Sequence, residues 1–230
     1  MKTETLLPKL RSKVMRRSAA AFTLVEMIVV ITIITILLTV GALGLKNLSK
    51  GSGVSAGLPV AEAVFAEARA IAIGKGTNAR VLIHANFNPN DDFHKERYLK
   101  YMIVAYEELD ADGNPNGNWK LDSRGVTLPD NVYFIKDLSE NNAPPLQTDT
   151  IELPGRSSSS CYYYQFNSEG LITSPEISGN SVPRFVIRVA SLPPGQQDPI
   201  ASSDAEKNMG GFVIWRSGRT SIFRHPDQIE

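Results

Sequence analysis

The fold is decided by the stretch from Arg16 to Leu45, which reads RRSAAAFTLVEMIVVITIITILLTVGALGL. No residue from Met27 to Leu45 is charged, and the apolar run extends back to Phe22 with Glu26 as its one interruption. A helix over residues 22–45 would be about 36 Å long, which is enough to cross the hydrocarbon core of a bilayer. The stretch therefore predicts a membrane-spanning helix that leaves the basic N-terminus in the cytoplasm and carries the rest of the chain across.

The charge distribution is uneven although the 230-residue chain has 24 basic and 24 acidic side chains. Residues 1–21 carry six basic side chains and Glu4, a net charge of +5, so the remaining residues carry −5. The basic segment indicates a separate role for the N-terminus, and the acidic body argues against direct nucleic-acid binding. A single cysteine, Cys161, excludes an intramolecular disulfide and a multi-cysteine metal site.

The order of small and apolar residues separates two kinds of N-terminal segment. A secretory signal peptide has its small-residue cleavage site after the apolar region, whereas residues 18–21 come before it. A carboxylate buried in a spanning helix costs about 2.5–3.5 kcal/mol, less where it lies near the interface, so a plain anchor has no reason to keep Glu26. Cleavage between Ala21 and Phe22 would create an α-amino group close to Glu26. In an assembly of staggered helices, Glu26 of one subunit could neutralise that amine on its neighbour.

At these residues the sequence resembles the type IV prepilin and type II secretion pseudopilin superfamily. The basic leader, the small residue and Phe-Thr-Leu-Val-Glu-Met before a long apolar run match its processing and methylation motif. The resemblance implies that prepilin peptidase cleaves between Ala21 and Phe22 and N-methylates Phe22, and that Glu26 serves filament assembly. It implies as further partners other pilins or pseudopilins, an inner-membrane assembly platform and the lipid bilayer, and it implies no cofactor.

The composition divides the chain into a basic leader (1–21), a transmembrane assembly helix (22–45), a Gly/Ser-rich linker or kinked helix (46–58) and a globular head (59–230). Gly51, Gly53 and Gly57 each weaken a helix by roughly 1 kcal/mol relative to alanine, so we expect a kink or a melted turn here. Residues 53–57 also fit the G-x-S-x-G pattern of esterases. That motif requires a preceding strand, so a linker is the better interpretation.

The head begins with an amphipathic helix. Pro59 suits its first turn and Gly74-Lys75-Gly76 predicts its end. The side chains expected on its buried face are Ala61, Val64, Phe65, Ala68, Ile71 and Ala72. The expected strands are Ala79–Ala85, Arg97–Glu107, Val132–Lys136, Cys161–Phe166, Phe185–Ala190, Phe212–Arg216 and Thr220–Arg224.

These elements predict an α+β fold in which a long N-terminal helix, with a membrane-spanning half and an amphipathic half, packs on an antiparallel β-sheet head. The pattern resembles pilin-like heads, most closely those of the minor pseudopilin H and FimT-like group. Long loops at 86–96, 137–160 and 191–210 exceed what a minimal head needs and could carry specific contacts.

Two groups of polar residues are candidates for a metal site. Asp110, Asp112 and Asn114 offer alternating oxygen ligands, but the spacing fails the EF-hand pattern. A solvated hairpin loop is the preferred interpretation of these residues, and calcium stays an open alternative. His84, His94 and His225 show no paired metal spacing, and strand or surface positions explain them.

The sequence therefore predicts a non-enzymatic structural subunit, a minor component of a type II secretion pseudopilus or a type IV pilus. It would be a single-pass inner-membrane protein with a periplasmic or extracytoplasmic head, associated with the filament after assembly. A competence pilin for DNA uptake and a signal-anchored extracytoplasmic binding module or enzyme are the alternatives.

The residue before the expected cut yields a test. The family usually has glycine there, and Ala21 predicts slower cleavage because its methyl group must fit the same site. A methyl group in a tight pocket is worth about 1–3 kcal/mol, so Ala21→Gly should raise the initial rate of leader removal about tenfold in a pulse-chase measurement. Ala20→Gly is the matched control and should leave the rate unchanged; equal rates for both variants would contradict the assigned cleavage position.

Overall fold

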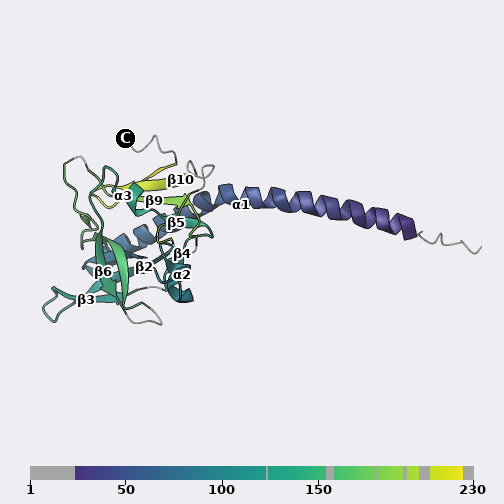
Figure 1. The fold of residues 1–230 in the computed structure, drawn as a ribbon. Helices are drawn as coiled ribbons and strands as arrows, with labels where there is room; N and C mark the ends of the chain where they lie inside the picture. The colour runs from purple at the N-terminus through teal and green to yellow at the C-terminus, as the bar shows by residue number, and fades with distance from the viewer. Residues whose placement is uncertain are drawn as a thin grey trace, which may run out of the picture. The chain divides into compact units, whose positions relative to one another are not determined.

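A computed structural model describes residues 24–122, 124–153, 158–179, 181–193, 196–201 and 208–224, without the side chains of residues 36–52. The chain divides into two compact units, residues 1–45 and residues 46–230, and each is described by itself. The elements in chain order are α1 (Leu24–Lys75), β1 (Ala79–His84), α2 (Asp92–Arg97), β2 (Tyr101–Leu109), β3 (Pro115–Leu121), β4 (Val126–Thr127), β5 (Val132–Phe134), α3 (Lys136–Glu140), β6 (Gln147–Ile151), β7 (Ser159–Phe166), β8 (Ile172–Ser174), β9 (Arg184–Val189), β10 (Met209–Ile214) and β11 (Thr220–Phe223) (Figure 1).

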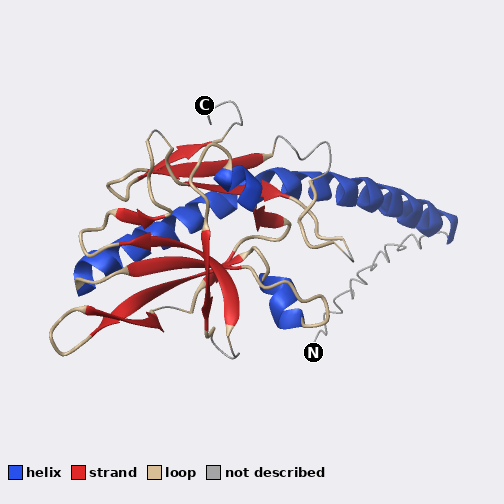
Figure 2. Ribbon diagram, turned by 60° about the vertical axis from the view of Figure 1, so that its left-hand side comes forward, coloured by secondary structure: helices blue, strands red, loops and turns tan. Residues whose placement is uncertain are grey.

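The strands form two antiparallel sheets where the sequence analysis expected one. Sheet A has the order β3-β2-β1-β7-β6, with β4 paired to β2 and β8 paired to β7. Sheet B has the order β11-β10-β9-β5. Figure 2 shows the part of α1 that belongs to the head running between the strands of the two sheets. The α+β class, with an N-terminal helix followed by an antiparallel β-sheet head, is therefore confirmed and is consistent with a pilin-like fold.

The predicted apolar stripe of α1 is the centre of the core. Of its members, Ala61, Val64, Phe65, Ala68 and Ala72 are buried, and Ile71 is half-buried. Phe65 meets aromatic rings of both sheets edge to face, at centroid distances of 5.0 Å from Tyr164 in β7 and 4.9 Å from Phe212 in β10. The same side chain lies 5.3 Å from Phe185 in β9. One helix face thus holds the two sheets in a common core.

The end of α1 follows the sequence prediction. Gly76 has a φ of +65°, its N–H donates to the carbonyl of Ile73, and the N–H of Thr77 donates to the carbonyl of Ala72. These two bonds form the Schellman arrangement that satisfies the last carbonyl groups of a helix, and glycine suits the left-handed position.

Residues 46–58 are helical, so the linker alternative for this segment is wrong. Gly53 and Gly57 do not break the helix; they allow it to pack closely on sheet B. A Cβ on Gly53 would lie 2.9 Å from Cγ2 of Val132, and one on Gly57 would lie 3.2 Å from Cδ1 of Ile187. On the opposite side, a Cβ on Gly210 of β10 would lie 3.0 Å from Cγ1 of Val54. The two glycines of the G-x-S-x-G pattern therefore lie on a helix face that packs on a sheet.

Pro59 lies inside α1, and its expected place in a first helical turn is wrong. Proline has no N–H to donate to the carbonyl four residues earlier, which belongs to Ser55. Ser55 is exposed, so water can satisfy that carbonyl. Leu58 and Ala61, on either side of the proline, are buried and supply the packing that keeps the segment helical.

Two of the expected long loops contain regular structure. Residues 86–96 include most of α2, and residues 137–160 include most of α3, all of β6 and the start of β7. The polar sequence of β6 forms a strand because Arg80 of β1 reaches its Asp149, with 2.5 Å between Nη1 and Oδ2. In β3, the ring of Trp119 packs 3.8 Å from the same guanidinium group. Residues 202–207 of the third loop, 191–210, lie outside the described residues.

The close approach at Gly57 predicts the outcome of a matched pair of substitutions. Gly57→Val should lower the free energy of unfolding by about 1–3 kcal/mol, because the added methyl groups overpack the contact with Ile187 and Pro129. Gly74→Val, at a helical glycine whose Cβ would meet nothing within 4 Å, should change it by less than about 0.5 kcal/mol. Urea unfolding of the full-length protein in detergent measures both. Equal losses would mean that Gly57 is not a packing position.

Candidate functional site

The residues singled out at the N-terminus are described only in part. Ala21 and Phe22, the expected cleavage and methylation positions, lie outside the described residues. Glu26 lies in the first turn of α1 and is exposed. A carboxylate at this end of a helix is favoured by the positive pole of the helix dipole. The structure thus gives the position of Glu26, and the ion pair with a neighbouring subunit's amine stays a prediction.

Residues 24–35 form a helical surface that is apolar on all sides. Every residue in this range is exposed, including Leu24 at 76% and Ile31 at 58%. The hydroxyl groups of Thr32 and Thr35 donate back to the carbonyls of Ile28 and Ile31, both at 2.7 Å, so these polar groups are satisfied within the helix. A helix that is apolar all round is stable when lipid or other helices cover it.

Among the described residues, no helix is long and apolar enough to cross a membrane. The side chains of residues 36–52, which include the second half of the predicted span over residues 22–45, lie outside the described residues.

The candidate calcium ligands Asp110, Asp112 and Asn114 lie at the turn between β2 and β3. Oδ1 of Asp110 accepts hydrogen bonds from the N–H groups of Asp112, at 2.9 Å, and Asn114, at 2.8 Å. The N–H of Asp110 donates to the carbonyl of Asn114 at 2.8 Å, which closes the turn. The Asp110 carboxylate therefore orders the hairpin. Across the described ranges there is no group of three or more His, Cys, Asp or Glu side chains that could hold a metal ion.

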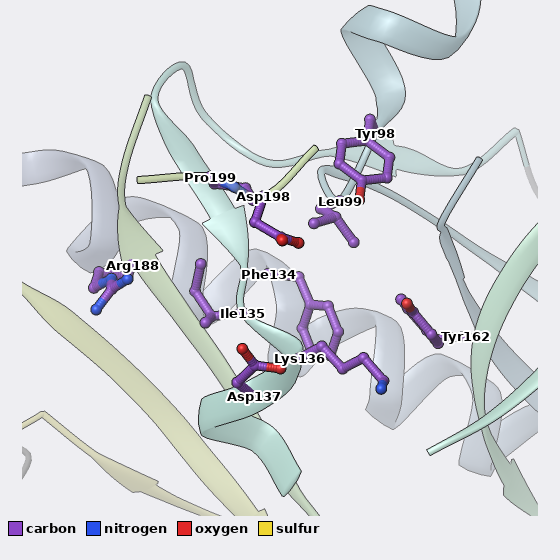
Figure 3. A pocket seen from close by; sticks show the side chains of 10 residues that line it. All are labelled: Tyr98, Leu99, Phe134, Ile135, Lys136, Asp137, Tyr162, Arg188, Asp198 and Pro199. Atoms are coloured by element: carbon purple, nitrogen blue, oxygen red, sulfur yellow. The ribbon is translucent and has the colours of Figure 1, made fainter. Parts of the chain in front are cut away.

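A small cavity lies in the head, between β7 of sheet A on one side and helix α3 with strands β5 and β9 of sheet B on the other (Figure 3). Its volume is about 120 Å³. Figure 3 shows the hydroxyl groups of Tyr98 and Tyr162 and the carboxylate of Asp198 directed toward the same space. Burial, followed by the nearby Tyr162 and Asp198, raises the pKa of Tyr98 to about 12, so Tyr98 stays a neutral donor.

The charged groups at this cavity are of both signs. Lys136 lies 5.7 Å from the centre of the Tyr162 ring and forms an ion pair with Glu140 at 3.2 Å. The remaining lining residues are Leu99, Phe134, Ile135, Asp137, Arg188 and Pro199. The cavity can hold a few waters or a small polar molecule.

Sequence reasoning missed a pair of histidines. His84 in β1 is buried, and its Nε2 lies 3.0 Å from Nδ1 of His94 in α2. Nothing in the local pattern predicts this contact, because it depends on α2 folding back over the strand that precedes it. Cys161 of β7 is 1% exposed, and burial raises its pKa to about 12.

Comparison with known proteins bears on the N-terminal segment alone. A family model described as the prokaryotic N-terminal methylation motif matches residues 16–42. No curated protein and no solved structure matches the chain. The matched range contains Ala21, Phe22 and Glu26, so the predicted prepilin-type motif is confirmed.

The motif supports a prepilin-like subunit of the type IV pilin superfamily with a membrane-anchored N-terminal segment. It implies processing by prepilin peptidase and assembly with other pilins. The resemblance of the head to the minor pseudopilin H and FimT-like group stays a prediction.

Proposed function

We propose that the chain is a non-enzymatic structural subunit, a minor component of a type II secretion pseudopilus or a type IV pilus. Prepilin peptidase removes residues 1–21 and methylates the new amine of Phe22. The mature protein is then held in the inner membrane by α1, with its head outside the cytoplasm, until the assembly platform adds it to the filament. The observation that carries this proposal is the methylation motif at residues 16–42, which includes the exposed aliphatic surface of helix residues 24–35.

The surface of α1 supports this role. Residues 24–35 expose large aliphatic side chains and contain one charged residue, Glu26. Lipid covers such a surface before assembly, and the same surface of neighbouring subunits covers it afterwards. In either environment a cation at the same depth stabilises a carboxylate. The α-amino group of a neighbouring Phe22 provides that cation.

The alternative of a signal-anchored binding module requires a ligand pocket, and the more enclosed of two hollows in the head is the cavity beside Tyr98 and Tyr162. A volume of about 120 Å³ is well below the roughly 300–1,000 Å³ typical of ligand pockets. We therefore prefer the structural role. The two roles differ in what they require of Glu26, because an anchor functions without it and an assembling subunit does not.

Substitution of Glu26 tests the assembly role. Glu26→Gln should reduce incorporation into filaments by at least about tenfold, because the amine of the neighbouring subunit then lacks its counter-charge. Cross-linking in native membranes, followed by quantification of the protein in the filament fraction, measures incorporation. The mature form of the variant should still begin at Phe22, since the variant is still cleaved.

Glu169→Gln is the matched control, because it removes the same charge from an exposed turn of the head. It should assemble like the unmodified protein. If Glu26→Gln also assembles normally, Glu26 has no role in assembly. If neither the variant nor the unmodified protein enters the filament fraction, the chain is a signal-anchored protein and its head has another role.

A further inference from the structure

Helix α2 covers part of the outer face of sheet A, the face turned away from α1. This face carries a second apolar cluster that includes Leu82, Ile103, Cys161 and Tyr163. None of the residues of α2 is itself buried. Its main apolar contact is Phe93, which packs against the cluster and meets the His84 ring edge to face at a centroid distance of 6.2 Å. So short a helix, with so little buried surface, depends on its polar contacts to stay in place.

Three side chains make these polar contacts, each touching the next: His84, His94 and Asp91. Nε2 of His84 and Nδ1 of His94 lie 3.0 Å apart, with the ring planes inclined by 12°. Nε2 of His94 lies 4.0 Å from Oδ2 of Asp91, and Oδ1 of Asp91 accepts from the N–H of Phe93 at 2.9 Å as the N-cap of α2. Asp91 therefore both starts the helix and faces the outer histidine.

The donor and acceptor roles of the imidazole nitrogens depend on the tautomer, and the Asp91 carboxylate beside Nε2 of His94 favours a proton on that atom. With an N–H on Nε2 of His94 directed at Asp91, Nδ1 of His94 is an acceptor and Nε2 of His84 is the donor. Nδ1 of His84 then carries no proton, and it has no hydrogen-bond partner among the described residues. A proton added to His84 must go to this atom, where it would be a buried donor without an acceptor.

Within the described part of the head, no group that faces His84 compensates such a charge. From α2, Arg97 adds a second cation and Asp91 faces the far side of His94. From β2, burial raises the pKa of Tyr101, which therefore stays neutral. From β7, Cys161 lies opposite His84 in the sheet register with a pKa near 12. The next anion, Asp149 of β6, is paired with Arg80.

We propose that Asp91, His94 and His84 form an acid-sensitive latch that holds α2 on the outer face of sheet A and releases it when the surroundings become acidic. Release breaks the contact between the two imidazoles, lets water reach His84 and uncovers the cluster around Leu82 and Tyr163. The latch is a conformational device in the head, and it is independent of cleavage and assembly at the N-terminus.

The direction of the pH dependence follows from His84. Burial, then the charges of His94 and Arg97, lowers its pKa from 6.5 to about 4 while the latch is closed. In the open form the exposed ring has its ordinary pKa, so between about pH 6.5 and 4 the open form binds a proton that the closed form does not. Falling pH in this window favours opening, and the open population at pH 5.0 should be about 30-fold higher than at pH 7.5.

Amide hydrogen exchange of the full-length protein in detergent, with EDTA present, tests the latch. The amides of Lys95 and Tyr98 donate to the carbonyls of Asp91 and His94, so they report on α2. After correction for the intrinsic pH dependence of exchange, their opening constants should rise about 30-fold from pH 7.5 to pH 5.0. Amides of β9 and β10 should keep their protection.

His84→Phe keeps a ring in the cluster and removes the titrating group, so the pH effect on α2 should vanish. The chain has three histidines, and His225→Asn is the matched control that should retain the effect. If His84→Phe does not fold, NMR titration of the unmodified protein decides: the His84 ring should stay neutral down to about pH 5. A change in α2 protection below about threefold, or a His84 ring that titrates near pH 6.5, would overturn the proposal.

Discussion

Burial of one face of α1 against two sheets is the interaction on which the head depends. Phe65 meets Tyr164 and Phe166 of sheet A and Phe185 and Phe212 of sheet B, all edge to face. At the far end of this contact, Nε of Arg69 donates to the carbonyls of Gly170 and Ser217, in the turns that follow β7 and β10. Each sheet packs its inner face against the helix between them, so the two sheets and α1 share one core.

This arrangement gives α1 two kinds of partner. Its residues from Val54 to Ala72 pack within the head, and residues 24–35 present aliphatic side chains outward. The motif at residues 16–42 implies that the outward part is processed and assembled with other pilins. In the proposed function, the membrane or the filament covers the one part while the two sheets cover the other. Glycine at positions 53 and 57 then reflects how closely the helix must approach sheet B.

The sequence was informative wherever a local pattern decided the outcome. The stripe around Phe65, the stop at Gly76 and the expected strands follow from spacing, and all of them are present within a few residues. Strands β3 and β6 were missed because their polar residues gain order from partners far away in the sequence, through pairing with β2 and β7 and contacts with Arg80. The histidine pair was missed for the same reason, since α2 must fold back onto β1. Gly53 and Gly57 were predicted to weaken the helix, whereas they allow it to pack closely on sheet B. Composition alone does not distinguish these two uses of glycine.

The central claim is that the N-terminus is that of a mature prepilin, and mass spectrometry of the N-terminal peptide from native membranes tests it most directly. The account predicts a peptide that begins at Phe22, with one methyl group on its α-amine and no trace of residues 1–21. An intact leader in cells with an active prepilin peptidase would contradict it, because Glu26 would then have no processed amine to pair with.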